Sequence, residues 1–285
     1  MNNHDEKLFP ILDSSLILTT FKKLYNIKIV DCGNYSQVYF YENKILKTNK
    51  DTFDLDLKKI NINKMFNDSN KKVNDIISKR NSTKIEEKNI IRSKLECQRL
   101  AKANIDDWKT FITLTFAENI IDIKLANKRF RYFIDKVQRI KKDLKYICIP
   151  EFQKRGATHY HLLTNIDIFD KKLIYLQEDN NKFFHIKYWN DGFTSVEILT
   201  GDVKKIIGYI AKYMTKDIDN RLFNCHRYFF SRNLNRPVVS YIDLDNIKDL
   251  EFYKKITQEK DLIFREGYLN KYDNTNVLFL EYLKK

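Results

Sequence analysis

The sequence predicts an α+β fold, and two kinds of segment carry that prediction. Phe111–Phe116 (FITLTF) is rich in β-branched and aromatic residues, which favours a strand. Leu125–Leu144 repeats apolar residues with the period of a helix. Along the rest of the chain, strand-like and helix-like segments alternate irregularly, which favours an α+β arrangement over a doubly wound parallel sheet.

Length and composition are those of a globular protein. The chain has 285 residues, of which 43% are hydrophobic and 32% charged, enough for one large domain or two small ones. A chain of this length can bury a core without disulfides or a structural metal. Gly (6) and Pro (3) are too scarce for collagen-like, Pro-rich or Gly/Ser-linker architectures.

The chain is strongly basic. Lys and Arg number 52 against 38 Asp and Glu, which gives a net charge of +14 at pH 7. Such a charge favours a polyanionic partner, most often nucleic acid. The alternative is the coding bias of an AT-rich genome, since Lys, Asn and Ile are all frequent, and charge alone does not separate the two.

The sequence indicates a cytoplasmic protein without a membrane partner. Its four cysteines are scattered, form no C-x-x-C pattern and are expected to be reduced thiols. The first residues lack a positively charged segment, and Pro10 and Asp13 interrupt the apolar patch that follows, which argues against a signal peptide. No uninterrupted run of about 18 apolar residues occurs.

The two ends of the chain differ from its middle. Asn34–Phe40, preceded by Gly33, predicts one strand of a β-hairpin. The highly charged residues 50–100 contain no Gly or Pro and predict helices, of which Ile85–Ala103 is the clearest. We therefore expect an N-terminal accessory region over residues 1–104, the main domain over 105–245 and a C-terminal helical tail over 246–285.

The main domain is expected to begin with a strand and an amphipathic helix. In Phe111–Phe116, Thr113 and Thr115 lie on one face and Ile112 and Leu114 on the other. In Leu125–Leu144, an apolar stripe faces the core, while Lys and Arg crowd the rest of the surface.

Two further strands carry a possible metal site. Tyr146–Phe152 and Thr158–Thr164 are joined by a short loop, and His159 and His161 project from one face of the second strand. If the strands pair around residue 155, Glu151 falls opposite His159, close enough to share a cation.

Two imidazoles and one carboxylate suit Mn²⁺, Fe²⁺ or Zn²⁺, or Mg²⁺ when a phosphate completes the ligand shell. Pro150 removes one ladder donor, which implies a sheet edge or a bulge nearby. The alternative is a pair of surface histidines on a strand, with no metal.

A second chemical signal lies on the helix predicted over Val203–Lys216. Tyr209, Lys212, Tyr213 and Lys216 are spaced i, i+3, i+4 and i+7, so they share one stripe of that helix. Phenols beside ammonium groups suit nucleophilic attack on phosphate, because the cations favour the phenolate and neutralise the phosphate. The alternative is ordinary packing, since amphipathic tyrosines are common where helices meet sheets.

The order of these signals resembles the HUH endonucleases, the rolling-circle replication initiators of small phages, plasmids and single-stranded DNA viruses. Phe111–Phe116 looks like their first motif, Thr158–Leu163 (THYHLL) like the metal-binding second motif, and Tyr209–Lys216 (YIAKYMTK) like the two-tyrosine third motif. Arg227–Pro237 also resembles a segment downstream of the third motif in bacterial replication proteins.

The resemblance implies a fold and a metal site. The fold would be a central antiparallel sheet of about five strands with flanking helices, here with a helical N-terminal extension, and residues 105–245 would form the endonuclease domain. His159 and His161, with Glu151 as the third ligand, would bind Mg²⁺ or Mn²⁺.

The resemblance also implies roles for the tyrosine stripe. Tyr209 and Tyr213 would be the nucleophiles, one of which attacks the scissile phosphate to form a 5′-phosphotyrosine and a free 3′-OH. Lys212 and Lys216 would orient the tyrosines and phosphates. The expected partners are single-stranded origin DNA, a host DNA polymerase and a host helicase, because the chain lacks a G-x-x-x-x-G-K-[ST] motif.

Residues that contact DNA are expected in two basic segments. Arg129 and Arg131 lie on the basic side of the amphipathic helix, and Arg227, Arg232 and Arg236 are interleaved with aromatic residues. The alternative for those aromatic residues is a core strand. Competing functions are a transposase or relaxase of the same chemistry, and a DNA-binding regulator without catalysis.

Overall fold

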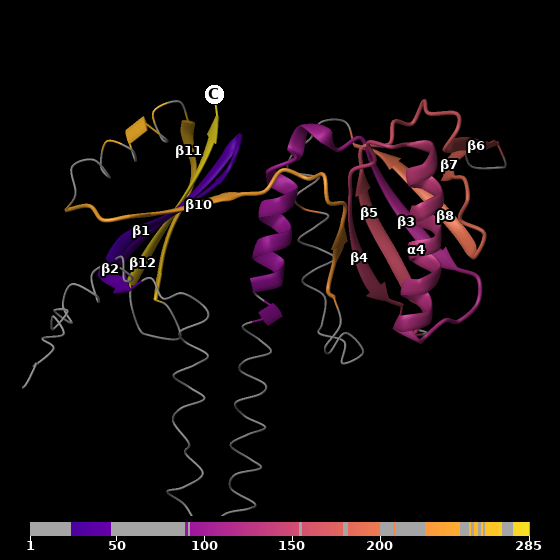
Figure 1. Cartoon of the computed structure of the whole chain (residues 1–285), viewed down its shortest axis with the longest axis horizontal. Coiled ribbons are helices and arrows are strands. Elements are labelled where there is room, and N and C mark those ends of the chain that lie inside the picture. Colours follow the sequence, from indigo (N-terminus) through magenta and orange to yellow (C-terminus); the bar gives the residue numbers. More distant parts are fainter. Residues whose placement is uncertain are drawn as a thin grey trace, which may run out of the picture. The chain divides into compact units, whose positions relative to one another are not determined.

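The computed structural model contains two compact units, each built around an antiparallel sheet (Figure 1). The helix expected over Val203–Lys216 lies outside the residues that the structure describes, apart from Gly208, which is helical. The described residues are 24–46, 89–90, 92–153, 156–178, 182–199, 208, 226–245, 251, 254–255, 258, 260–269 and 276–284.

The larger sheet has seven strands in the order β6-β7-β8-β3-β5-β4-β9. The expected antiparallel sheet is confirmed, but the expected number of about five strands is wrong. The short strands at the two margins of the sheet account for the difference. A short strand has no long apolar pattern by which it could be predicted, and it forms mainly because a neighbouring strand pairs with it. The strands are β3 (Thr110–Phe116), β4 (Tyr146–Phe152), β5 (Thr158–Thr164), β6 (Ile174–Glu178), β7 (Lys182–Ile186), β8 (Gly192–Ile198) and β9 (Phe229–Phe230).

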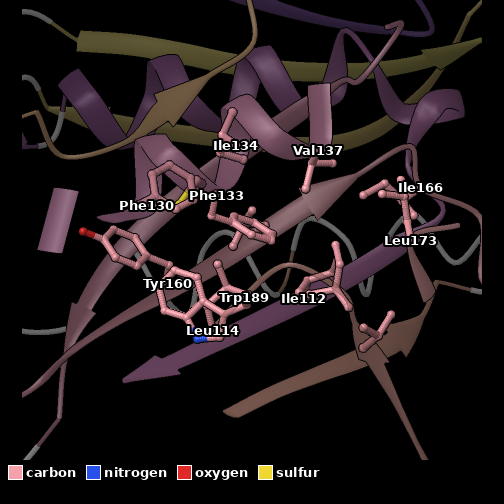
Figure 2. Close-up of a cluster of buried hydrophobic side chains, with 14 of the residues drawn as sticks. Ile112, Leu114, Phe130, Phe133, Ile134, Val137, Tyr160, Ile166, Leu173 and Trp189 are labelled. Atoms are coloured by element: carbon pink, nitrogen blue, oxygen red, sulfur yellow. The ribbon is translucent and has the colours of Figure 1, made fainter. Parts of the chain in front are cut away.

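The predicted amphipathic helix is confirmed as α4 (Ile123–Ile140), which lies across one face of this sheet (Figure 1). The Asp122 carboxylate caps its first turn by accepting a hydrogen bond from the backbone N–H of Lys124 at 2.8 Å. Its buried face packs onto the sheet, where the ring of Phe130 stacks on that of Tyr160 at 4.6 Å between centroids (Figure 2). This packing forms the core of the unit.

Strand alternation sends the remaining side chains to the other face of the sheet. Tyr160 and Leu162 of β5 belong to the core beneath α4. His159 and His161 alternate with them and therefore project from the face opposite α4. Burial of Tyr160 and Leu162 beneath α4 therefore fixes the face from which the two histidines project.

The smaller sheet has five strands in the order β10-β1-β2-β12-β11. The expected hairpin is confirmed: β1 and β2 are neighbours joined at Gly33, whose φ of 74° suits glycine in a tight turn. The strands are β1 (Leu24–Cys32), β2 (Tyr35–Leu46), β10 (Val238–Ile242), β11 (Lys260–Leu269) and β12 (Asn276–Lys284).

The C-terminal region is not the helical tail that we expected. Residues 260–269 and 276–284 are strands, although residues 251 and 254–255 are helical. In β12 Val277 and Leu280 are buried, and the strand pairs with β2, so segments from the N-terminal and C-terminal parts of the chain share one sheet. In the N-terminal region, residues 92–102 are helical as expected, but the described residues 24–46 form the strands β1 and β2, so the described part does not show the expected helical N-terminal extension. Residues 47–88 lie outside the described part.

Two further expectations concern the cysteines and the membrane. Cys32, Cys97 and Cys148 are free thiols and buried, while Cys225 lies outside the described residues. No helix in the described ranges combines the length and the apolar composition that crossing a bilayer requires.

Candidate active site

The candidate site lies on the face of the larger sheet opposite α4, on strands β3, β5 and β4, toward the β9 margin of the sheet. β5 runs between β3 and β4, and Glu151 of β4 pairs directly with His159 of β5, in the register that the sequence predicted. On the other side of β5, Thr115 pairs with His159 and Thr113 with His161. Three neighbouring strands therefore bring polar side chains together on this face.

His161 is held at both ring nitrogens. Its Nε2 lies 2.7 Å from Oε2 of Glu151, and its Nδ1 lies 3.2 Å from the hydroxyl oxygen of Thr113. The ring of Phe111 stacks on the imidazole with 5.7 Å between centroids. With only 5% of its surface exposed, His161 is a fixed group in a shielded position.

His159 completes the cluster. Its ring centroid lies 6.2 Å from that of His161, with 61° between the ring planes. Its Nε2 is buried from solvent. Two imidazoles and one carboxylate thus occupy adjacent positions on two strands.

The chemistry of these donors suits a divalent cation, because imidazole and carboxylate ligands are shared by Mn²⁺, Fe²⁺ and Zn²⁺ sites. In their present positions, however, no three His, Cys, Asp or Glu side chains of the described residues are arranged to enclose an ion. The Glu151–His161 contact occupies one ligand atom of each residue. A cation would therefore have to replace the proton shared between them.

Pro150 fits into β4 without the bulge that it could have implied. It pairs in register with Tyr160. The backbone N–H of Gln153 donates to the carbonyl of Ala157. By alternation, the backbone N–H and C=O groups of Glu151 and Ile149 point toward β5, whereas the backbone of Pro150 points toward the opposite side of β4. On that side β9 pairs only with Ile147 and Cys148, so Pro150 loses no hydrogen bond to a described strand.

The other expected catalytic residues lie elsewhere in the chain. Tyr209, Lys212, Tyr213 and Lys216 are outside the described residues, so their roles stay predictions. The cluster of Glu151, His159 and His161 is therefore the part of the site whose geometry is known.

The arginines expected to contact DNA fall into two groups. Arg129 forms ion pairs with Asp191 at 2.8 Å and Glu118 at 3.4 Å, which tie α4 to the sheet loops. Arg131 and Arg232 are exposed.

The two remaining arginines are engaged with the rest of the unit. Arg227 is half-buried, and burial lowers the pKa of its guanidinium. The guanidinium of Arg236 lies over the ring of Phe230 at 4.4 Å.

Phe193 is a potential functional residue that the sequence did not single out. In the aromatic-rich stretch Phe183–Phe193, Trp189 is buried, and its Nε1 donates to the carbonyl of Thr115 at 3.1 Å. Phe193, in contrast, pairs with Thr115 on the side away from His159 and is 72% exposed on the site face. The alternation of Phe193 and Ser195 with the buried Thr194 and Val196 was the signal that could have separated it.

Comparison with known proteins places this geometry in context. Residues 109–218 match the model of a family of replication-associated proteins, described under the name ORF2. The phasyl DNA replicon protein arp of Escherichia coli is 31% identical over 127 residues, which cover 39% of this chain and 44% of that protein. The chain thus spans less than half the length of this curated relative, and no solved structure matches. The matched residues 109–218 contain both the histidine cluster and the tyrosine stripe, so this part of the chain is similar to replication-associated proteins.

Proposed function

We propose that the protein initiates rolling-circle replication by nicking single-stranded DNA at a replicon origin. The observation that carries the proposal is the 2.7 Å contact of Glu151 with His161, beside His159, on the neighbouring strands β4 and β5. This cluster falls in the segment that is similar to replication-associated proteins.

The proposed reaction is a transesterification. The phenol oxygen of Tyr209 or Tyr213 forms a bond to the scissile phosphorus and gives up its proton, while the bond from phosphorus to the 3′ oxygen breaks. The released 3′ oxygen takes up a proton, which leaves a 3′-OH for a polymerase and a 5′-phosphotyrosine on the protein. Because one phosphoester replaces another, the step needs no ATP and can run in reverse to rejoin strands.

The residues of the sheet would position the reacting phosphate. Glu151, His159 and His161 would hold Mg²⁺ or Mn²⁺, which would polarise a phosphoryl oxygen and stabilise its charge. Thr113 and Phe111 keep the His161 ring in place, so the site needs little rearrangement of that side chain. Lys212 and Lys216 would neutralise phosphate charge beside the attacking phenol.

The test is covalent adduct formation with a single-stranded oligonucleotide from the protein's own replicon origin. We expect a band of increased mass on a denaturing gel in the presence of Mg²⁺ or Mn²⁺, and none with a chelator. Tyr209→Phe and Tyr213→Phe separately should each leave some adduct if the two phenols are interchangeable, and the double variant should leave none.

The alternatives give different outcomes. A DNA-binding regulator would bind the oligonucleotide without forming an adduct under any metal condition. A transposase or relaxase would form adducts with the ends of a mobile element or a transfer origin and not with the replication origin.

A further inference from the structure

A groove of about 660 Å³ lies on the α4 side of the larger sheet, on the face opposite the histidine cluster. One wall is α4, and the other is the segment around β9. A cavity of this size is within the range of sites for small molecules and cofactors. Its place in the fold separates it from Glu151, His159 and His161.

The wall opposite α4 is fixed to β4 by hydrogen bonds. The N–H of Ser231 donates to the carbonyl of Tyr146, and the N–H of Tyr146 donates to the hydroxyl of Ser231, both at 3.0 Å. The side-chain amide of Asn233 donates to the carbonyl of Leu144 at 3.2 Å. The groove is therefore held open by regular contacts of the fold.

Aromatic rings form the floor of the groove. Phe229 packs against Phe130 with 5.8 Å between ring centroids, and His226 lies 6.3 Å from Phe229. His226 is exposed and Phe229 is half-buried, so part of this surface can be reached from solvent. Flat, partly exposed rings are suited to stacking against nucleic-acid bases.

The rim is cationic. Arg131 of α4, Lys142 just after α4 and Arg232 of the opposite wall are exposed, and none of the three forms an ion pair with another residue in the described part of the chain. Asp135 is a carboxylate on the rim and can accept a hydrogen bond from the amino group of a base. Three cations around an aromatic floor complement a nucleotide, which has phosphates outside a flat base.

We infer that this groove binds a nucleotide of single-stranded DNA, with the base against Phe229 and the flanking phosphates on Arg131, Lys142 and Arg232. The identity of the ligand rests on the proposed function. Phe229 pairs with Cys148, which lies three residues from Glu151 along β4, a separation of about 10 Å. A DNA strand leaving the histidine face can therefore turn round the β9 edge and enter the groove.

The edge itself supports this path. Phe230 pairs with Ile147, which belongs to the histidine side of the sheet, and packs with Tyr228 at 5.6 Å between ring centroids and with the Arg236 guanidinium. Phe230 and Tyr228 also line the groove, which therefore reaches the edge strand. Phe229 lies on the groove face. Both faces of the edge strand thus offer aromatic surface to one continuous strand of DNA.

The first test compares two charge-matched triple variants. R131Q/K142Q/R232Q removes the rim cations, and K124Q/K128Q/K136Q removes three charges from α4 outside the groove. Affinity for an origin-strand oligonucleotide is measured by fluorescence anisotropy against salt concentration in a chelator, which prevents cleavage. Thermal melts check that both variants are folded.

We expect the rim variant to bind at least tenfold more weakly and its salt slope to fall by about 2, since each phosphate contact to a single strand contributes about 0.7. The control variant reports the general effect of losing three charges and should weaken binding less. Equal losses of affinity and slope in the two variants would overturn the inference.

A second measurement locates the DNA directly. An origin-strand oligonucleotide carrying 5-iodouracil is irradiated with the unsubstituted protein, and cross-linked peptides are identified by mass spectrometry. Cross-links to Phe229 or His226 support the groove, and cross-links confined to other surfaces refute it. If these cross-links appear but the tyrosine adduct does not form, the nickase proposal is refuted and the groove is supported. If the adduct forms without these cross-links, the nickase proposal is supported and the groove is refuted.

Discussion

Glu151 pairs in register with His159 but places its Oε2 2.7 Å from the Nε2 of His161, so its carboxylate reaches diagonally across the β4–β5 ladder. Diagonal neighbours on an antiparallel sheet are about 7–8 Å apart at the backbone, within reach of a Glu side chain. The carboxylate is therefore adjacent to one histidine by register and bonded to the other. This arrangement makes Glu151 the residue on which the proposed metal site depends most.

Replacing Glu151 by Gln should separate charge from hydrogen bonding. The amide can still bond to His161 but cannot carry a ligand charge, so adduct formation should fall at least about tenfold and require more Mn²⁺. The measurement is adduct yield against Mn²⁺ concentration. Glu197→Gln, on the same face in β8, is the matched control. Indistinguishable metal curves for the two variants would argue against Glu151 as a ligand.

Phe193→Ala should weaken binding of single-stranded DNA. The ring is 72% exposed on the site face and lies in the row Phe193, Thr115, His159 across three strands. Loss of one stacked base should reduce the binding free energy by about 1–3 kcal/mol. Fluorescence anisotropy with an oligonucleotide measures the change. Phe169, exposed at 85% in the loop after β5, provides the control Phe169→Ala, and an equal effect there would exclude a specific role for Phe193.

Arg129 and Arg131 should have different roles although they are neighbours on α4. Arg129 is paired with Asp191 and Glu118, so Arg129→Gln should lower the free energy of unfolding by up to about 1 kcal/mol. Arg131→Gln should leave stability within about 0.5 kcal/mol and reduce affinity for single-stranded DNA. Urea unfolding and anisotropy on both variants provide the comparison, and the reverse pattern would contradict these assignments.

Gly192→Ala should destabilise the larger sheet. A Cβ at Gly192 would lie 2.2 Å from the carbonyl oxygen of Thr115, and its φ of 154° is unfavourable for other residues. Because β3 and β8 would have to separate, we expect a loss of at least about 2 kcal/mol in urea unfolding. Gly267→Ala, with open space around the added methyl group, should change stability by less than about 0.5 kcal/mol. Similar values for the two variants would refute the steric argument.

Tyr160→Phe should lower the free energy of unfolding at neutral pH. The variant should also lose less of that free energy than the unsubstituted protein as the pH rises above about 10. The Tyr160 hydroxyl donates to Oδ1 of Asn127 at 2.6 Å, and its removal should reduce the free energy of unfolding by about 1 kcal/mol. Burial raises the pKa of Tyr160 above its usual value of about 10, so the folded state resists ionisation. The measurement is the urea midpoint against pH.

The sign of the pH effect follows from the direction of that shift. A folded-state pKa above the unfolded value gives stability that is complete below about pH 10 and declines as the pH rises further. Burial also raises the pKa of Tyr146 and of Tyr228 to about 12, so the unsubstituted protein should lose stability between about pH 10 and 12. The decline should be less steep for Tyr160→Phe, and an unchanged decline would show that Tyr160 does not contribute.

The strands that carry the histidine cluster could be predicted because their local signals agree. Tyr146–Phe152 and Thr158–Thr164 have the bounds expected from their apolar and β-branched residues. Gly156, with φ of 92°, marks the turn between them. Once the turn is placed, counting outward gives the register, which is why Glu151 could be set opposite His159 before the fold was known.

Other features depend on contacts that no local pattern contains. β12 pairs Leu280 with Val38, more than two hundred positions away, so the sheet that the C-terminal strands join could not be predicted from their own sequence. The diagonal reach of Glu151 to His161 depends on side-chain rotamers, which register alone does not determine. Arg129 looked available for DNA because its partners, Asp191 and Glu118, are brought to it only by the fold.

Pro150 has a consequence for self-association. Edge strands with free backbone groups invite pairing with other chains, and proline at an outward-facing position removes a donor that an added strand would need. On the outer side of β4, beyond the two residues paired with β9, Pro150 has no N–H to donate to an added strand. This missing donor lies one residue before Glu151. Proline at this position therefore disfavours pairing with an added strand beside the proposed metal-ligand carboxylate, as far as the described residues show.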